Sequence, residues 1–150
     1  SEILPDLTLK PGFVCGTPYR SIQRDVEKAD KVLKLLSSED IGQGIVVENG
    51  LVLGIETLQG TNELLKFVKK TSVHLRIAET GGVFVKRPKF NQNLQFDMPV
   101  IGPETINLAC NAGLRGLVVS PLSVIVLDQE NCLQIAKANN FFILAKDSTS

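Results

Sequence analysis

The residues best suited to chemistry lie between Lys86 and Thr105. Two cations, Lys86 and Lys89, precede Asp97, which has apolar residues on both sides and is the sole acid in the stretch 80–103. A carboxylate binds Mg²⁺ or orients a water molecule, and lysine ammonium groups neutralise the oxygens of a phosphate. This set of charges is suited to handling a phosphate.

Further polar candidates stand where secondary-structure elements are expected to begin or end, the positions at which sites are usually assembled. Gln43 precedes an expected hairpin, Glu56 follows it, and Thr61 and Thr105 stand at expected helix starts. Glu56 joins Asp97 as a candidate for holding a metal ion or a water molecule. The amides of a helix start attract phosphate oxygens, so the start near Thr105 is a candidate phosphate site.

A structural explanation stands beside each of these assignments. Lys86, Arg87 and Lys89 can also form a solvated surface, and Glu56 can be a surface acid at the end of a strand. The chain has no Walker A loop, no Rossmann glycine fingerprint and no metalloprotease motif, so the common nucleotide enzymes have no local support.

Composition narrows the classes of protein to consider. With 150 residues, of which 43% are hydrophobic, the chain has the length of one domain. The 16 basic and 16 acidic residues cancel, which argues against a nucleic-acid binder. No apolar run approaches the roughly 18 residues that span a bilayer, and the first residues lack the pattern of a signal peptide, so we expect a cytoplasmic protein.

The cysteines and the single histidine give no metal or nucleophile pattern. Cys15, Cys110 and Cys132 are widely spaced, which predicts neither a disulfide framework nor a zinc site. We expect reduced thiols, with Cys110 and Cys132 packed on the apolar faces of helices. His74 is expected at a solvated position.

The first elements are a linker and a helix. Residues 1–16 are expected to form an extended, partly docked linker because they contain prolines and glycines among scattered hydrophobics. An amphipathic helix is expected to begin at Thr17-Pro18 and to end near Ser37-Ser38. Its charged face is expected to be solvated and contains Arg24, Asp25, Glu27, Lys28 and Lys31.

The rest of the chain predicts an α/β domain. Asn49-Gly50 lies between two β-rich runs, which predicts a hairpin over 44–56 because both turn residues tolerate a positive φ. The other expected elements are helices over 61–69 with Thr61 as cap, from Gly102-Pro103 to Gly113 and from Asp128 to Asn139, and strands over 83–86, 117–120, 124–127 and 141–145. The runs on either side of Pro121 are expected to form a hairpin or adjacent strands. This order predicts a single α/β domain with packed helices and a mixed parallel and antiparallel sheet.

Four stretches, in this order, resemble a known family. They are Asp40-Ile41-Gly42-Gln43, Glu56 with Gly60-Thr61, Lys86 to Lys89, and the run Asp97-Met98-Pro99-Val100-Ile101-Gly102-Pro103-Glu104-Thr105. The resemblance covers the stretch from about Leu33 to Ala145. It is to the C-terminal domain of the LpxI-type UDP-2,3-diacylglucosamine pyrophosphatases of lipid A synthesis.

The resemblance implies a Mg²⁺-dependent hydrolase that cuts the pyrophosphate of UDP-2,3-diacylglucosamine with water, giving UMP and 2,3-diacylglucosamine 1-phosphate. It also implies a preceding N-terminal domain, a lipid nucleotide-sugar substrate and work at the inner-membrane surface, with a linker over 1–16, the catalytic domain over 17–146 and a tail over 147–150. The aspartate essential in the family matches Asp97. The expected site therefore has Asp97 and Glu56 as catalytic residues, Asp97 as metal ligand, and Lys86, Lys89, Gln43, Thr61 and Thr105 as substrate-binding residues.

Three positions depart from the family pattern. Asn62 stands where an aspartate is usual, and Asn93 and Gln95 stand in place of an acid and an arginine. These differences keep open a second interpretation, a noncatalytic module that binds a nucleotide sugar or phosphate. A third interpretation is a scaffold domain without a small-molecule site.

Overall fold

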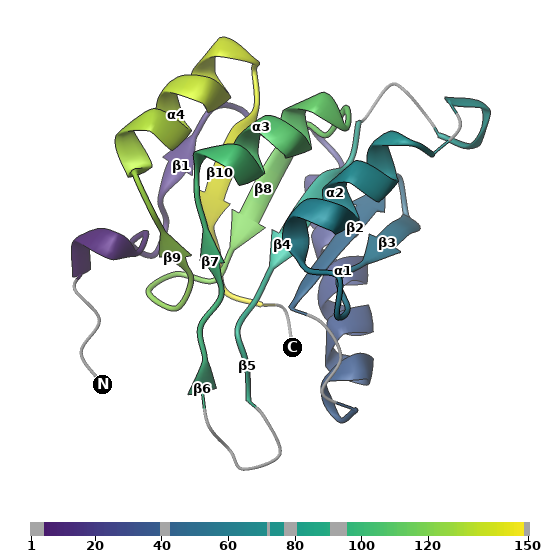
Figure 1. Ribbon diagram of the computed structural model, residues 1–150, viewed down its shortest axis with the longest axis horizontal. Coiled ribbons are helices and arrows are strands. Elements are labelled where there is room, and N and C mark those ends of the chain that lie inside the picture. Colours follow the sequence, from purple (N-terminus) through teal and green to yellow (C-terminus); the bar gives the residue numbers. More distant parts are fainter. Residues whose placement is uncertain (1–4, 40–42, 72, 77–80, 91–95, 149–150) are drawn as a thin grey trace.

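A mixed six-stranded sheet forms the centre of the protein (Figure 1). The computed structural model describes residues 5–39, 43–71, 73–76, 81–90 and 96–148. The strands, in order across the sheet, are β1 (Val14–Cys15), β10 (Phe142–Ala145), β8 (Gly116–Val119), β4 (Val83–Lys86), β2 (Gly44–Glu48) and β3 (Leu51–Ile55). β10, β8 and β4 are parallel to one another, and the remaining pairs are antiparallel. The predicted mixed α/β fold is confirmed.

Helices cover both faces of this sheet (Figure 1). α1 (Ile22–Ser37) packs on one face, and α2 (Thr61–Lys69), α3 (Pro103–Asn111) and α4 (Gln129–Ala138) pack on the other. Side chains alternate along each strand, so Val46 and Phe84 belong to the core beneath α2 to α4, while Ile45 and Val83 pack under α1. Among the described residues, none of the helices combines the length and apolarity needed to cross a membrane.

Two short strand pairs lie outside the main sheet. β5 (Lys89–Phe90) pairs antiparallel with β6 (Phe96–Asp97), and β7 (Val100–Ile101) pairs parallel with β9 (Ile125–Val126). Figure 1 shows β5 and β6 projecting beyond the end of β4. Short 3-10 turns occur at η1 (Pro5–Leu7) and η2 (Val73–Leu75).

The expectation that residues 117–120 and 124–127 pair as a hairpin or as neighbours is wrong. β8 lies within the main sheet, whereas β9 pairs with β7. The chain leaves the sheet after β8 because Leu122 adopts a positive φ of 63° and its amide donates to the Leu9 carbonyl, 2.9 Å away.

The predicted β2–β3 hairpin is confirmed, and an acid supports its turn. Asn49 and Gly50 have φ values of 49° and 81°, as a tight hairpin turn requires. Their amides donate to the carboxylate of Asp25, at 3.2 and 2.7 Å, and Asp25 also accepts the hydroxyl of Tyr19. Asp25 is 1% exposed, so the expectation that it lies on a solvated helix face is wrong.

The N-terminal segment is more closely packed than its composition indicates. β1 adds to the edge of the main sheet, and Leu9 and Cys15 are buried in the core. α1 begins at Ile22 rather than at Thr17-Pro18, because Tyr19 first forms a turn, accepting a hydrogen bond from the Ile22 amide, and packs its ring edge-on against Phe142.

The three thiols are free, as expected. Cys15 and Cys132 are buried and Cys110 is half-buried, which confirms the packing role expected of the two helical cysteines. Burial raises the pKa of Cys110 and of Cys132 to about 11. His74 is exposed in η2, as predicted.

Candidate functional site

The directions of the strands bring Glu56 and Lys86 to the same edge of the main sheet. β3 and β4 both run antiparallel to β2, so they point the same way. Glu56 follows β3, and Lys86 is the last residue of β4. The carboxyl ends of β8 and β10 lie at this edge as well, because these strands are parallel to β4. The carboxyl ends of parallel strands are the usual place for a ligand site in α/β proteins.

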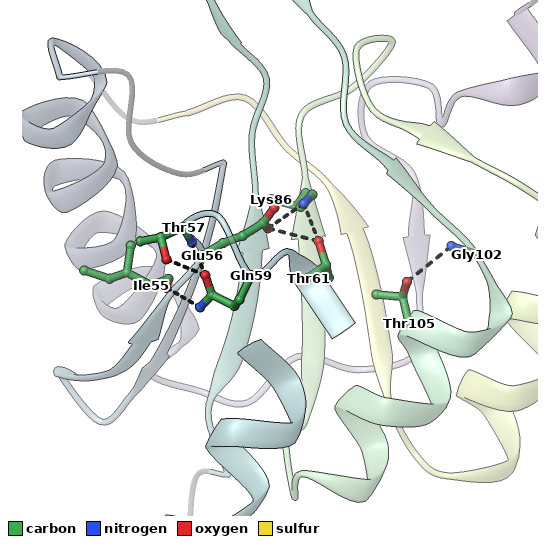
Figure 2. A network of polar contacts seen from close by, with 8 residues as sticks. All are labelled: Ile55, Glu56, Thr57, Gln59, Thr61, Lys86, Gly102 and Thr105. Carbon is green, nitrogen blue, oxygen red and sulfur yellow. Dashed lines mark hydrogen bonds and ion pairs between the residues drawn. The ribbon is translucent and has the colours of Figure 1, made fainter. Parts of the chain in front are cut away.

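Three of the predicted site residues form one buried hydrogen-bonded network (Figure 2). The Lys86 ammonium group donates to Glu56 Oε1 and to Thr61 Oγ1, at 2.6 Å in both cases. Thr61 Oγ1 in turn donates to Glu56 Oε1, 3.0 Å away. The side chains of Lys86 and Glu56 are 3% and 12% exposed, so the charges compensate each other away from bulk water.

Gly44 makes room for this network. It pairs with Lys86 across the β2–β4 ladder, and its carbonyl accepts the Glu56 amide at 2.8 Å. A Cβ at this position would lie 2.7 Å from Glu56 Oε1 and 2.8 Å from an edge carbon of Phe84. Only glycine leaves the Glu56 carboxylate where it is.

Thr61 is not the cap residue that the sequence predicted. α2 is confirmed over Thr61–Lys69, but Gly60, with a φ of 85°, occupies the cap position. Thr61 is the first helical residue, and its hydroxyl bonds with Glu56 and Lys86. The threonine therefore joins the start of α2 to the charged pair.

Gln59 is a site residue that the sequence did not single out. Its side-chain oxygen accepts the amide and the hydroxyl of Thr57, and its side-chain nitrogen donates to the Ile55 carbonyl at 3.4 Å (Figure 2). These bonds fix the loop that connects Glu56 to Thr61. A glutamine in a polar loop gives no local signal of this role.

A cleft of about 550 Å³ opens between the N-termini of α2 and α3. Thr61 and Thr105 line it from the two helices, and the Thr105 hydroxyl accepts a weak hydrogen bond from the Gly102 amide at 3.5 Å. The lining residues are Gln59, Gly60, Thr61, Asn62, Glu63, Val100, Ile101, Gly102, Pro103, Glu104, Thr105 and Leu127. Two helix N-termini that face one cleft favour an anionic ligand, because their amides carry partial positive charge.

Lys89 and Asp97 lie on the β5–β6 pair. They are direct partners in its antiparallel register. The structure describes the backbone of Asp97. Asp40, Asn93 and Gln95 lie outside the described residues. The candidate catalytic aspartate is therefore carried on a short strand pair that continues from β4.

Lys86 and Arg87 are more buried than their sequence context indicated. Lys86 and Arg87 are 2% and 6% exposed, so a solvated surface is wrong for both. The Arg87 amide donates to the Gln43 carbonyl at 2.8 Å, which holds Gln43 beside the end of β4. Gln43 is half-buried at this edge of the sheet.

The donors for a metal ion are sparse. Across the described part of the chain, no group of three or more histidine, cysteine, aspartate or glutamate residues is placed to hold an ion. Glu56 uses Oε1 to accept two hydrogen bonds. Mg²⁺ needs as few as one or two protein carboxylates, and the candidates among the predicted site residues are Glu56 and Asp97.

Comparison with known proteins decides the family. The model of the LpxI C-terminal domain matches residues 10–144. The chain belongs to the LpxI C-terminal domain family. It is 34% identical over 149 residues to the UDP-2,3-diacylglucosamine pyrophosphatase LpxI of Caulobacter vibrioides, a match covering 97% of this chain. The chain spans 53% of the length of that relative. The LpxI C-terminal domain match includes every predicted site residue, and it begins inside the segment 1–16.

Proposed function

We propose that this chain is the C-terminal part of a Mg²⁺-dependent UDP-2,3-diacylglucosamine pyrophosphatase. The reaction is hydrolysis of the pyrophosphate bond to give UMP and 2,3-diacylglucosamine 1-phosphate, a step of lipid A synthesis. Family membership and the name of the Caulobacter relative support the activity. The structural observation that carries the proposal is the buried Lys86–Glu56–Thr61 network, which opens through Thr61 into a cleft between two helix N-termini.

The chain's own residues have distinct roles in this proposal. The Thr105 hydroxyl and the backbone amides at the starts of α2 and α3, that of Thr61 among them, bind phosphate oxygens in the cleft. Lys86 supplies positive charge behind Thr61, and Glu56 holds the ammonium group and the hydroxyl in fixed positions. Such preorganised charge is the main protein contribution to phosphoryl-group chemistry.

Asp97 is the proposed metal ligand. With the substrate phosphates it would hold Mg²⁺, which supplies charge neutralisation and lowers the pKa of a bound water. Lys89, its partner in the β5–β6 register, adds a cation for the phosphates beside it. Gln43, held beside the end of β4, is the remaining proposed substrate-binding residue.

We further propose that the protein works in the cytoplasm at the surface of the inner membrane, since the substrate carries two acyl chains. The Caulobacter relative is longer than this chain, and its additional segment is the proposed second half of the lipid site. The form to assay is therefore this domain joined to that additional segment, called the complete protein below.

Turnover and binding should be measured together in the complete protein. We expect UMP release from UDP-2,3-diacylglucosamine with Mg²⁺, and loss of release after chelation with EDTA. A ligand that binds only the folded state raises its thermal stability, so a shift without UMP release would favour the noncatalytic module. Neither a shift nor release would favour the scaffold.

A further inference from the structure

A buried arginine–aspartate pair lies immediately behind the candidate site. Arg87 Nε and Nη2 donate to Asp30 Oδ1 and Oδ2, at 2.9 and 3.1 Å, in a two-pronged contact. The side chains of Arg87 and Asp30 are 7% and 2% exposed. Asp30 lies on α1, on the opposite face of the sheet from α2, and Arg87 directly follows Lys86. Neighbouring residues of an extended chain point to opposite faces of a sheet, so Lys86 reaches Thr61 on one face while Arg87 reaches Asp30 on the other.

Arg87 also ties together several segments at this edge of the sheet. Its Nη1 donates to Ser120 Oγ at 3.1 Å, just after β8, and to the carbonyl of Lys146, just after β10. Its backbone amide donates to the Gln43 carbonyl at 2.8 Å, just before β2. One side chain and one amide thus fix the end of β4 against four other segments.

Buried ion pairs contribute little net stability compared with well-packed apolar residues, so stability alone does not account for a pair at this place. We propose that Asp30 and Arg87 are positioning residues for the proposed pyrophosphatase reaction. They hold the end of β4 so that Lys86 stays within hydrogen-bond reach of Glu56 and Thr61. They also fix the point from which the β5–β6 pair leaves the sheet. This inference rests on the proposed function.

The chain offers a matched control pair at the other end of the same sheet. Arg76 Nε and Nη2 donate to both oxygens of Glu48, with the shortest distance 2.9 Å, and Arg76 Nη1 donates to the Ala112 carbonyl at 2.6 Å. The side chains of Arg76 and Glu48 are 13% and 2% exposed. Glu48 is the last residue of β2, whereas Gly44, the first, pairs with Lys86. Breaking this pair removes a similar buried contact far from the site.

The experiment compares Asp30→Asn with Glu48→Gln in the complete protein, below the unfolding temperature of both. Because small misplacements of catalytic groups cost up to about a hundredfold in rate, we expect Asp30→Asn to lower kcat by roughly tenfold or more, with a smaller change in KM. Glu48→Gln should stay within about twofold of the wild type. Equal kcat losses in the two variants would overturn the positioning role and leave a structural one.

A second variant covers the case in which Asp30→Asn does not fold. Arg87→Lys keeps a cation beside Asp30 but loses the two-pronged geometry. We expect this variant to fold, with kcat still lowered by roughly fivefold or more. Wild-type kcat in this variant would overturn the proposal.

Amide hydrogen exchange separates this proposal from the proposed function. If the wild type releases no UMP, the function fails, but positioning is still tested by the amides of Arg87 and Glu56, which bond to Gln43 and Gly44. We expect exchange at these amides to become roughly tenfold faster in Asp30→Asn or Arg87→Lys and to stay unchanged in Glu48→Gln. Equal exchange in all the variants would overturn it.

Discussion

The Lys86–Glu56 pair should give a large and non-additive effect on stability. Replacing Glu56 by glutamine keeps the shape and an acceptor oxygen but removes the charge opposite a lysine that is 3% exposed. Breaking a buried pair costs about 3–5 kcal/mol, and the 12% exposure of Glu56 argues for the lower end, about 3 kcal/mol. For a domain of this length that is a fall in melting temperature of about 10 °C.

The partner substitution and the double variant complete the cycle. Lys86→Met leaves Glu56 with its Thr61 hydrogen bond and partial exposure, so we expect a smaller cost of about 2 kcal/mol. The double variant should cost about 2–3 kcal/mol rather than the roughly 5 kcal/mol of an additive pair, because neither charge is left without the other. Turnover should be lost in all three variants.

Urea unfolding of this chain, followed by fluorescence and circular dichroism, measures the three values. The surface pair Lys66–Glu63 on α2 is a matched control. Lys66 Nζ lies 3.1 Å from Glu63 Oε2, and the two side chains are 51% and 59% exposed. We expect Glu63→Gln to change stability by less than about 0.5 kcal/mol. Additivity of the Glu56 and Lys86 effects within about 0.5 kcal/mol would refute the buried pair.

Three further predictions concern space, protonation and the hairpin. Gly44→Ala should cost about 1–3 kcal/mol in urea unfolding and lower turnover, because its Cβ collides with Glu56; unchanged activity would contradict this. The pKa values of Cys110 and Cys132 are raised from 9.0 to about 11, so between these pH values the folded state binds more protons than the unfolded state. The free energy of unfolding should therefore be constant below about pH 9 and fall between about pH 9 and about pH 11. With both thiols replaced by alanine, the urea midpoint should change less with pH in this range; an unchanged pH dependence would contradict the prediction. Asp25→Ala, which leaves two hairpin amides without their acceptor, should lower stability by about 2–3 kcal/mol in thermal unfolding, whereas a loss below about 0.5 kcal/mol would contradict the support of the turn.

Local chemistry made part of the fold predictable. The β2–β3 hairpin depends on the two positive φ values that Asn49-Gly50 tolerates, and α2 follows from helical spacing of its apolar residues. The pairing of β9 with β7 was not predictable in this way, because parallel partners are distant in sequence. The positive φ that redirects the chain occurs at Leu122, a residue type that gives no turn signal.

The site was predicted in its members but not in its contacts. Glu56, Thr61 and Lys86 were candidates from their places at element ends, and the network joins all three. Arg87 and Asp30, 57 residues apart, were missed because a charged residue looks the same in sequence whether its partner is water or a buried counterion. Burial of a charge depends on tertiary packing, which no local pattern encodes.

The most direct test of the proposed function is hydrolysis of UDP-2,3-diacylglucosamine by the complete protein with Mg²⁺, comparing the wild type with Asp97→Asn. We expect the wild type to release UMP and the variant to be slower by roughly a thousandfold or more, because the proposed metal ligand loses its charge. Equal rates for the two proteins would contradict the catalytic role of Asp97. Absence of UMP release from the folded wild type would contradict the pyrophosphatase activity itself.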